Sequence, residues 1–261
     1  MDFSRIELDE GDQTFLNELR AFLKLHVTDE VRRRDRESGD NFDEKVHLAL
    51  GDAGYLSARH KAESEGGFTP IRRRIWELEI QRAQMPSYHM GTTFMIAKTL
   101  EVCASEQLKQ EVIPKVLSGD VRLCLGYTEP EGGSDVATCN TRAVRDGADW
   151  IINGSKMFTS NAQHSQFVFL ITNTDPGGRK HKNLTMFLVP LDSPGIEIHG
   201  IRTIDGDRTN IVYYSDVRVA DRYRVRDVNG GGGAGRLARV GSANPWGSRA
   251  LGLGQIAGLR G

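Results

Sequence analysis

The chain has 261 residues, 38% of them hydrophobic, and a net charge of −1 at neutral pH. This length allows one large domain or two smaller ones around a sizeable core, and the near-zero charge gives no indication of a nucleic acid or an anionic membrane as partner. No apolar run reaches the ~18 residues that a spanning helix needs, and no signal peptide is recognisable at the start, so we expect a cytoplasmic protein.

The first part of the chain, residues 1 to about 120, follows a helical pattern. Apolar residues between Phe15 and Leu23 recur at helical spacing. Asn41 is followed three residues later by Glu44, a pair typical of a capping box that opens a second helix. We therefore expect the chain to begin with an all-helical domain.

Further helices are predicted up to residue 119. Thr69 before a proline is a favoured helix start, and the arginines at 72–74 that follow are interpreted as its solvated side. The apolar stretch at 90–102 predicts a buried helix. Ser105 is the expected cap of the next helix, which runs towards Gly119.

After residue 120 the pattern changes to short, β-rich segments separated by turn residues. The expected strands are 123–127, 138–144, 150–152, 167–172, 184–189, 196–199 and 211–214. The dipeptides at 146–147 and 153–154 predict hairpins, and 175–178 predicts a turn. The fold class is therefore α+β, with a helical domain at 1–121 and an antiparallel β-barrel or sandwich at 122–228.

The final segment, 229–261, is rich in glycine and arginine and contains no lysine, aspartate or glutamate. Such a composition buries little apolar surface, so we expect this tail to be poorly ordered.

Two segments carry most of the chemical information. In the first, residues 127–135, two glycines stand among the hydroxyls of Thr128 and Ser134, which could edge a flat, polar-rimmed cofactor. Taken alone, this segment could also be an exposed Pro-Gly turn. In the second, residues 153–161, Phe158 and Ser160 share one face of an extended strand, although an ordinary core aromatic would explain them in isolation.

Taken together, these two segments resemble the acyl-CoA dehydrogenase family. Its first signature, Thr-Glu-Pro, two variable positions and Gly-Ser-Asp, is matched by residues 128–135. Its second signature, Asn-Gly-x-Lys-x-aromatic-(Ile/Thr)-(Thr/Ser), is matched by residues 153–160. Further family matches occur at 187–190 and 216–219, and the resemblance covers about residues 10 to 231.

The resemblance implies a flavoprotein that removes two hydrogens from Cα and Cβ of an acyl-CoA thioester and passes electrons to an electron-transfer flavoprotein. The residues that it implies as FAD contacts are Leu125, Tyr127, Thr128, Gly133, Ser134, Phe158 and Ser160. Phe158 would cover the flavin ring, Ser160 would hydrogen-bond near the reactive N5, and Ser134 would also lie close to the acyl-CoA. The run at 126–130 is similar to the actinobacterial subgroup that handles steroid side-chain thioesters.

The family's catalytic glutamate lies in a C-terminal four-helix domain that has no counterpart in this sequence, so no catalytic residue is assigned. After residues 228–231 the family pattern gives way to Gly, Arg and Ala, which we interpret as a truncation or a change of reading frame. We therefore expect impaired activity from the chain as given. The alternatives are a non-catalytic subunit that contributes part of an FAD site to a homo- or hetero-oligomer, and an inert fragment.

Cysteines and histidines add no metal site to this interpretation. The cysteines at 103, 124 and 139 are scattered and form no CxxC pair, so we expect reduced thiols. The seven histidines have no metal-ligand spacing either.

Overall fold

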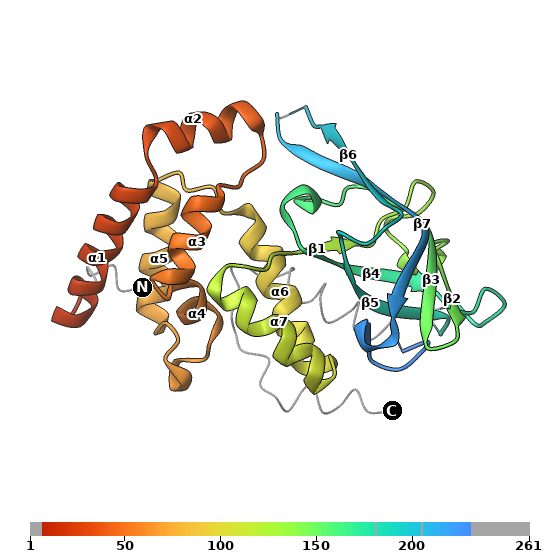
Figure 1. The fold of residues 1–261 in the computed structure, drawn as a ribbon. Helices are drawn as coiled ribbons and strands as arrows, with labels where there is room; N and C mark the ends of the chain where they lie inside the picture. The colour runs from red at the N-terminus through yellow and green to blue at the C-terminus, as the bar shows by residue number, and fades with distance from the viewer. Residues whose placement is uncertain (1–6, 181, 205, 231–261) are drawn as a thin grey trace, which may run out of the picture.

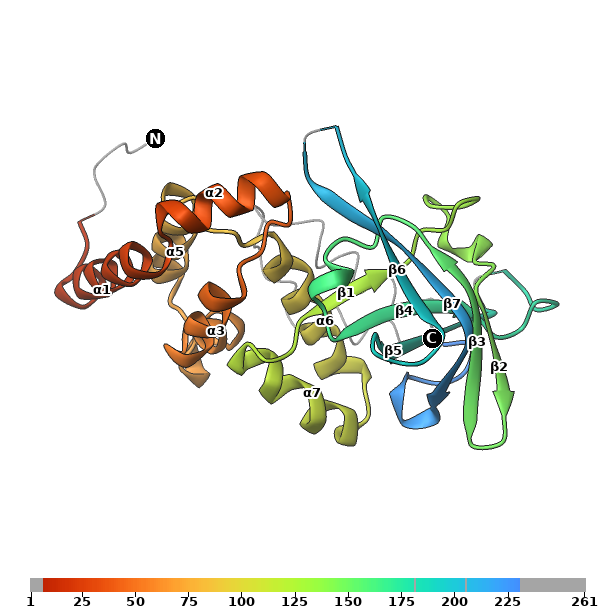
Figure 2. The ribbon, with the colours of Figure 1, turned by 45° about the horizontal axis from the view of Figure 1, so that its top comes forward.

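The structure, a computed structural model, describes residues 7–180, 182–204 and 206–230. It places a group of helices beside an eight-stranded mixed sheet (Figures 1 and 2). The predicted α+β class, a helical domain followed by a mainly antiparallel β domain, is confirmed. Nearly all of the predicted tail at 229–261 lies outside the described residues.

The helical domain is built from seven α-helices within the described residues. They are α1 (Glu10–His26), α2 (Asp29–Ser38), α3 (Glu44–Asp52), α4 (Tyr55–His60), α5 (Pro70–Arg82), α6 (Tyr88–Cys103) and α7 (Glu106–Ser118). The predicted caps of α5 and α7 are confirmed, since Thr69 Oγ1 and Ser105 Oγ each accept a hydrogen bond from a first-turn N–H. Helix α6 is the predicted buried helix and packs against strand β1 (Leu123–Gly126).

Two expectations about this domain are wrong in detail. Asp43, not Asn41, caps α3, because its Oδ1 accepts from Val46 N at 3.0 Å while Asn41 lies in the preceding loop with φ 51°. Arg72 is not simply solvated, because its Nε lies 2.9 Å from Asp12 Oδ1 on α1. A single sequence window does not show that α1 supplies this carboxylate.

The β domain contains the remaining strands. They are β2 (Arg142–Asp146), β3 (Asp149–Lys156), β4 (Phe167–Asn173), β5 (Leu184–Pro190), β6 (Ile196–Arg202), β7 (Arg208–Ala220) and β8 (Arg224–Val225). The order is β6-β7-β3-β2-β4-β5-β8, with β1 paired to β4. Most pairs are antiparallel, but β1 and β2 each meet β4 in parallel. Alternating hydrophobicity predicts strands without their direction, so the parallel pairs were not expected.

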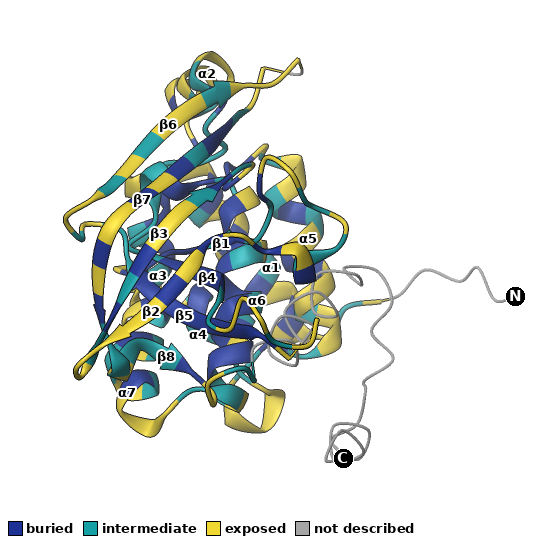
Figure 3. Ribbon diagram, turned by 90° about the vertical axis from the view of Figure 1, so that its right-hand side faces the viewer, coloured by how far each residue is buried: buried dark blue, intermediate teal, exposed yellow. Residues whose placement is uncertain are grey.

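Strands β4 and β5 are buried on both faces. On β4, Phe169 and Ile171 belong to the core shared with the helices, whereas Val168 and Leu170 face the second core inside the β domain. This double burial explains the uninterrupted apolar run of the sequence. Strand β7 instead alternates buried and exposed residues (Figure 3), as expected for a strand with one solvated face.

Some predicted turns and strands also differ from the structure. The hairpin at 146–147 is confirmed, because β2 and β3 pair on either side of it. The hairpin at 153–154 is wrong, because both residues lie inside β3, where the register with β7 shifts. Gly154 has φ 146°, so this glycine allows the shift in strand register and does not form a chain-reversing turn. The strand expected at 138–144 begins only at Arg142.

Arg122, at the entrance to β1, joins the two domains. Its Nε donates to His164 O at 2.6 Å and its Nη1 donates to Gly119 O at 3.2 Å. The guanidinium also lies 4.9 Å from the ring centroid of Phe42, which follows α2. The two domains are thus held in one arrangement beside β1, the strand that leads into the first signature.

Candidate functional site

The first signature begins where β1 ends. Strand β1 pairs with β4, and a Cβ on Gly126 would lie 2.8 Å from Leu170 Cδ1, so this side chain packs closely against the glycine. Beyond the strand, Glu129 N donates to Gly132 O at 2.8 Å and Gly132 N donates to Glu129 O at 3.1 Å. These two bonds close residues 129–132 into a tight loop and fix the start of the glycine-rich turn.

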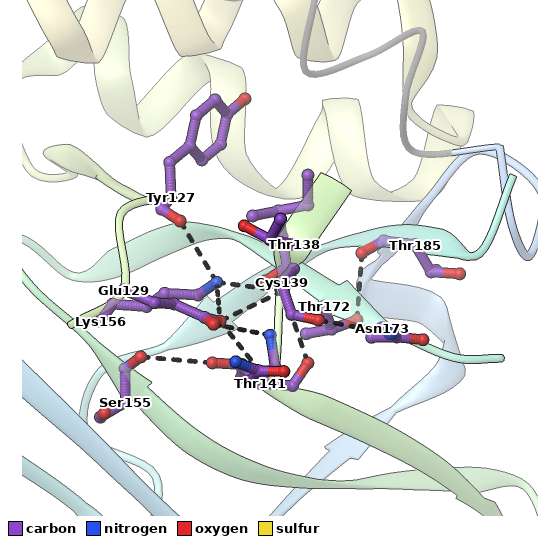
Figure 4. Close-up of polar contacts among 12 residues, drawn as sticks. Tyr127, Glu129, Thr138, Cys139, Thr141, Ser155, Lys156, Thr172, Asn173 and Thr185 are labelled. Carbon is purple, nitrogen blue, oxygen red and sulfur yellow. Dashed lines mark hydrogen bonds and ion pairs between the residues drawn. The ribbon is translucent and has the colours of Figure 1, made fainter. Parts of the chain in front are cut away.

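An ion pair lies beneath this turn (Figure 4). Lys156 Nζ is 2.7 Å from Glu129 Oε1, and both side chains are buried, Lys156 completely so. Lys156 Nζ also donates to Tyr127 O at 3.4 Å. Because Glu129 belongs to the first signature and Lys156 to the second, the pair fastens the two signatures together.

The Glu129 carboxylate is satisfied by several groups besides the lysine. Its Oε2 accepts from Asn140 N at 2.6 Å and its Oε1 accepts from Thr141 N at 2.9 Å. Burial alone would raise the pKa of Glu129, but the Lys156 charge and these hydrogen bonds outweigh it and lower the pKa to about 2. Glu129 is therefore a fixed anion and a poor general base at neutral pH.

Cys139 lies in the same network. Its Sγ lies 3.3 Å from Lys156 Nζ and 3.2 Å from Glu129 Oε1. Burial raises the pKa of this thiol to about 11, so it remains protonated. Cys103, Cys124 and Cys139 form no disulfide among themselves in the structure.

The second signature turns out of the sheet directly above the ion pair. Met157 N donates to Thr128 O at 2.8 Å, so the backbones of the two signatures lie side by side. Phe158 follows with φ 54° and a side chain that is 59% exposed. The predicted common strand face of Phe158 and Ser160 is wrong, because β3 ends at Lys156 and a turn begins there.

The predicted cofactor residues fall into two groups. Leu125 and Tyr127 are half-buried and pack against the core shared with the helices. Of the others, Thr128, Gly133 and Ser160 are also half-buried, and Ser134 and Phe158 are exposed. Within the described part of the chain, no hydrogen bond is formed by the hydroxyl of Thr128 or that of Ser134. Ser160 Oγ lies 3.2 Å from Thr209 Oγ1 on β7.

Sequence reasoning assigned no role to Glu129, Lys156 or Asn210. A signal for Lys156 was present, since it shares the alternation of Trp150 and Ile152 and therefore points inward with them. A lysine at such a position requires a buried partner. Asn210 had no comparable signal, because its contacts come from a distant loop.

Among the described residues, no three His, Cys, Asp or Glu side chains are grouped so that they could hold a metal ion. None of the helices in the described ranges is both long and apolar enough to cross a membrane.

Comparisons with known families identify both domains. Residues 9–120 match the family model of the acyl-CoA dehydrogenase N-terminal domain, and residues 124–217 match that of the acyl-CoA dehydrogenase middle domain. The acyl-CoA dehydrogenase FadE29 of Mycobacterium tuberculosis is 36% identical over 200 residues, which are 76% of this chain and 51% of the relative. The chain thus spans about half the length of this curated relative.

Solved structures give the same picture. A variant of the Tcur3481–Tcur3483 steroid ACAD has a TM-score of 0.80 and 33% identity, covering 88% of this chain and 62% of the other. The ChsE4–ChsE5 complex from Mycobacterium tuberculosis has a TM-score of 0.76 and 29% identity, covering 91% and 61%.

Proposed function

Because this chain belongs to the acyl-CoA dehydrogenase family, we propose that it provides the N-terminal and middle domains of an FAD-dependent enzyme acting on an acyl-CoA thioester. The reaction removes one hydrogen from Cα and one from Cβ to give the 2,3-enoyl-CoA. The observation that carries this proposal is the hydrogen bond from Met157 N to Thr128 O, which sets the exposed Phe158 beside the glycine-rich turn. FAD, when bound, supplies the acceptor for the hydride from Cβ.

The chemistry of the accessible residues fits such a cofactor. An exposed aromatic ring at Phe158 can cover a flat ring system, and the hydroxyls of Thr128 and Ser134 can hydrogen-bond its polar edge. Gly133 carries no side chain that would keep a ligand from the backbone. We assign Ser160 to the region of N5, Leu125 and Tyr127 to the supporting wall, and Ser134 also to the acyl-CoA.

The buried carboxylate of this site, that of Glu129, is not a suitable base for the α-proton. Glu129, a buried carboxylate of the first signature, is held as an anion by Lys156 and by backbone donors. A carboxylate with its pKa near 2 accepts a proton poorly. We therefore assign proton abstraction to the glutamate that the family resemblance places in a C-terminal helical domain, which another chain or further residues would supply.

The proposed substrates are acyl-CoA thioesters with a bulky, steroid-derived acyl group. This proposal is supported by the similarity to a solved protein described as a steroid ACAD, at 33% identity. The proposed electron acceptor is an electron-transfer flavoprotein.

A second candidate function is that of a subunit contributing part of an FAD site to a hetero-oligomer. It is supported by two similar solved structures, the Tcur3481–Tcur3483 steroid ACAD and the ChsE4–ChsE5 complex, each of which is named for two proteins. Under this proposal a partner would provide the base and the remaining cofactor contacts.

Two measurements test these proposals. First, the chain is purified with FAD, alone and co-expressed with a candidate partner, and its flavin absorbance is recorded. Second, flavin-loaded samples are given steroid side-chain and straight-chain acyl-CoA thioesters with an electron-transfer flavoprotein, and mass spectrometry follows the loss of two hydrogens. Absence of bound flavin under both conditions would refute the FAD role. Bound flavin with activity only in the co-expressed sample would favour the hetero-oligomer.

A further inference from the structure

Asn210, on β7, is completely buried beneath the turn that carries Phe158. Thr159 N donates to Asn210 O at 2.9 Å, and Asn210 Nδ2 donates to Thr159 O at 2.9 Å. The backbone carbonyl and the side-chain amide of Asn210 therefore bind the N–H and the C=O of Thr159, respectively. This reciprocal pair resembles one rung of a sheet, although Thr159 lies outside any strand.

The side-chain amide of Asn210 has two further partners. Its Nδ2 also donates to Gln163 Oε1 at 2.6 Å, and its Oδ1 accepts from Arg208 Nε at 3.3 Å. Gln163 Nε2 in turn donates to Asp40 Oδ1 at 3.0 Å, on the loop after α2. Asn210 thus connects the turn above it to a residue of the helical domain.

The turn that Asn210 holds has an unfavourable backbone. Phe158 and Asn161 have φ values of 54° and 63°, in the left-handed region that residues with a side chain seldom adopt. Such conformations persist only when surrounding contacts enforce them. Within the turn, Ser160 N donates to Phe158 O at 3.0 Å and Ala162 N donates to Thr159 O at 3.4 Å, while Asn161 O accepts from His164 N and Ser165 Oγ of the segment that follows.

We propose that Asn210 is a positioning residue that holds the 158–161 turn in the conformation presenting Phe158 and Ser160, and that Gln163 extends this support to Asp40. The relevance to FAD rests on the function proposed above, but the support of the turn does not. An aspartate or alanine cannot replace Asn210, because neither has two N–H groups that donate to Thr159 O and Gln163 Oε1.

The deciding experiment is hydrogen exchange read by mass spectrometry on the purified chain, comparing wild type with Asn210→Ala. Peptides covering 157–163 should exchange about tenfold faster in the variant. Local opening of the turn costs less there, because the hydrogen bonds from the Asn210 side-chain amide to Thr159 O and Gln163 Oε1 are absent. Asn153→Ala is the matched control, since Asn153 also bridges β3 and β7, through Asp216 at 2.9 Å, but on the exposed side. It should leave those peptides unchanged.

A second variant covers the case in which Asn210→Ala does not fold. Gln163→Ala keeps Asn210 and removes the connection to Asp40, so the same peptides should exchange about threefold faster. Unchanged exchange of 157–163 in a folded Asn210→Ala, or in Gln163→Ala when the first is unfolded, would overturn the proposal.

The consequence for the cofactor is measured separately. If the wild-type chain binds FAD, Asn210→Ala should weaken binding several-fold and alter the flavin absorbance bands, whereas Asn153→Ala should do neither. Unaltered binding and spectrum would overturn the positioning role towards the cofactor. If the wild-type chain binds no FAD, either alone or with a co-expressed partner, the proposed function fails, and exchange alone decides whether Asn210 supports the turn.

Discussion

Lys156 Nζ lies 2.7 Å from Glu129 Oε1 in the interior of the β domain, where these two residues join the two signatures. The cost of burying both charges is offset by their proximity and by the backbone donors around the carboxylate. Because the exposed Phe158 follows Lys156 by two residues, this buried pair supports the surface that we propose faces the cofactor.

Replacing the lysine should therefore be costly. We expect Lys156→Met to lower the free energy of unfolding by about 3–5 kcal/mol, because the Glu129 carboxylate is left buried without its counter-ion. Urea denaturation followed by circular dichroism measures this. The double variant Lys156→Met/Glu129→Gln should recover a large part of the loss, and a single variant within about 1 kcal/mol of wild type would contradict the assigned role.

His47 should make the protein sensitive to mild acid. Its Nδ1 lies 2.8 Å from His89 Nε2, and burial followed by the Arg122 charge lowers the pKa of His47 to about 4. Below pH 6.5, His47 is protonated in the unfolded chain but stays neutral in the folded chain. The free energy of unfolding is therefore retained above pH 6.5 and decreases as the pH falls to 4. The loss attributable to His47 is about 3 kcal/mol.

Urea denaturation at several pH values tests this dependence. In His47→Gln the unfolding free energy should vary less between pH 6.5 and 4, whereas the same change at the exposed His199 should leave the variation as in wild type. An unaltered pH dependence in His47→Gln would be evidence against the assignment.

Gly154 should not tolerate a side chain. Its φ of 146° is strained for other residues, and a Cβ would lie 2.6 Å from Thr141 Oγ1 and 2.7 Å from Thr141 Cα. We expect Gly154→Ala to destabilise the protein by about 2 kcal/mol or more. Gly177→Ala is the control, because nothing lies within 4 Å of its Cβ position. Equal melting temperatures of the two variants would contradict this explanation.

Phe158 should matter for FAD and little for stability. Its ring is 59% exposed, so Phe158→Ala should change the unfolding free energy by no more than about 0.5 kcal/mol. Loss of aromatic stacking should weaken FAD binding roughly fivefold, measured by quenching of flavin fluorescence on titration. Tyr213→Ala, at another exposed aromatic position, should bind FAD like wild type.

Local patterns predicted the elements better than their partners. Thr69 and Ser105 were identified as caps because a cap is a contact within one turn. Asp43 was missed because Asn41 offered an equally plausible sequence pattern. The pairing of β1 with β4 was missed because it joins segments more than forty residues apart, which no local period encodes.

The sequence by itself determined the order of a helical and a β domain, the family resemblance and the residues assigned to FAD. The domain order follows from local periodicity, the resemblance from motif residues that are contiguous along the chain, and the FAD assignments from that resemblance. Only the tertiary structure showed that Glu129 and Lys156 form a buried ion pair and that Asn210 hydrogen-bonds to Thr159. Such contacts depend on which distant segments the folded core brings together, and buried polar groups must find their partners there.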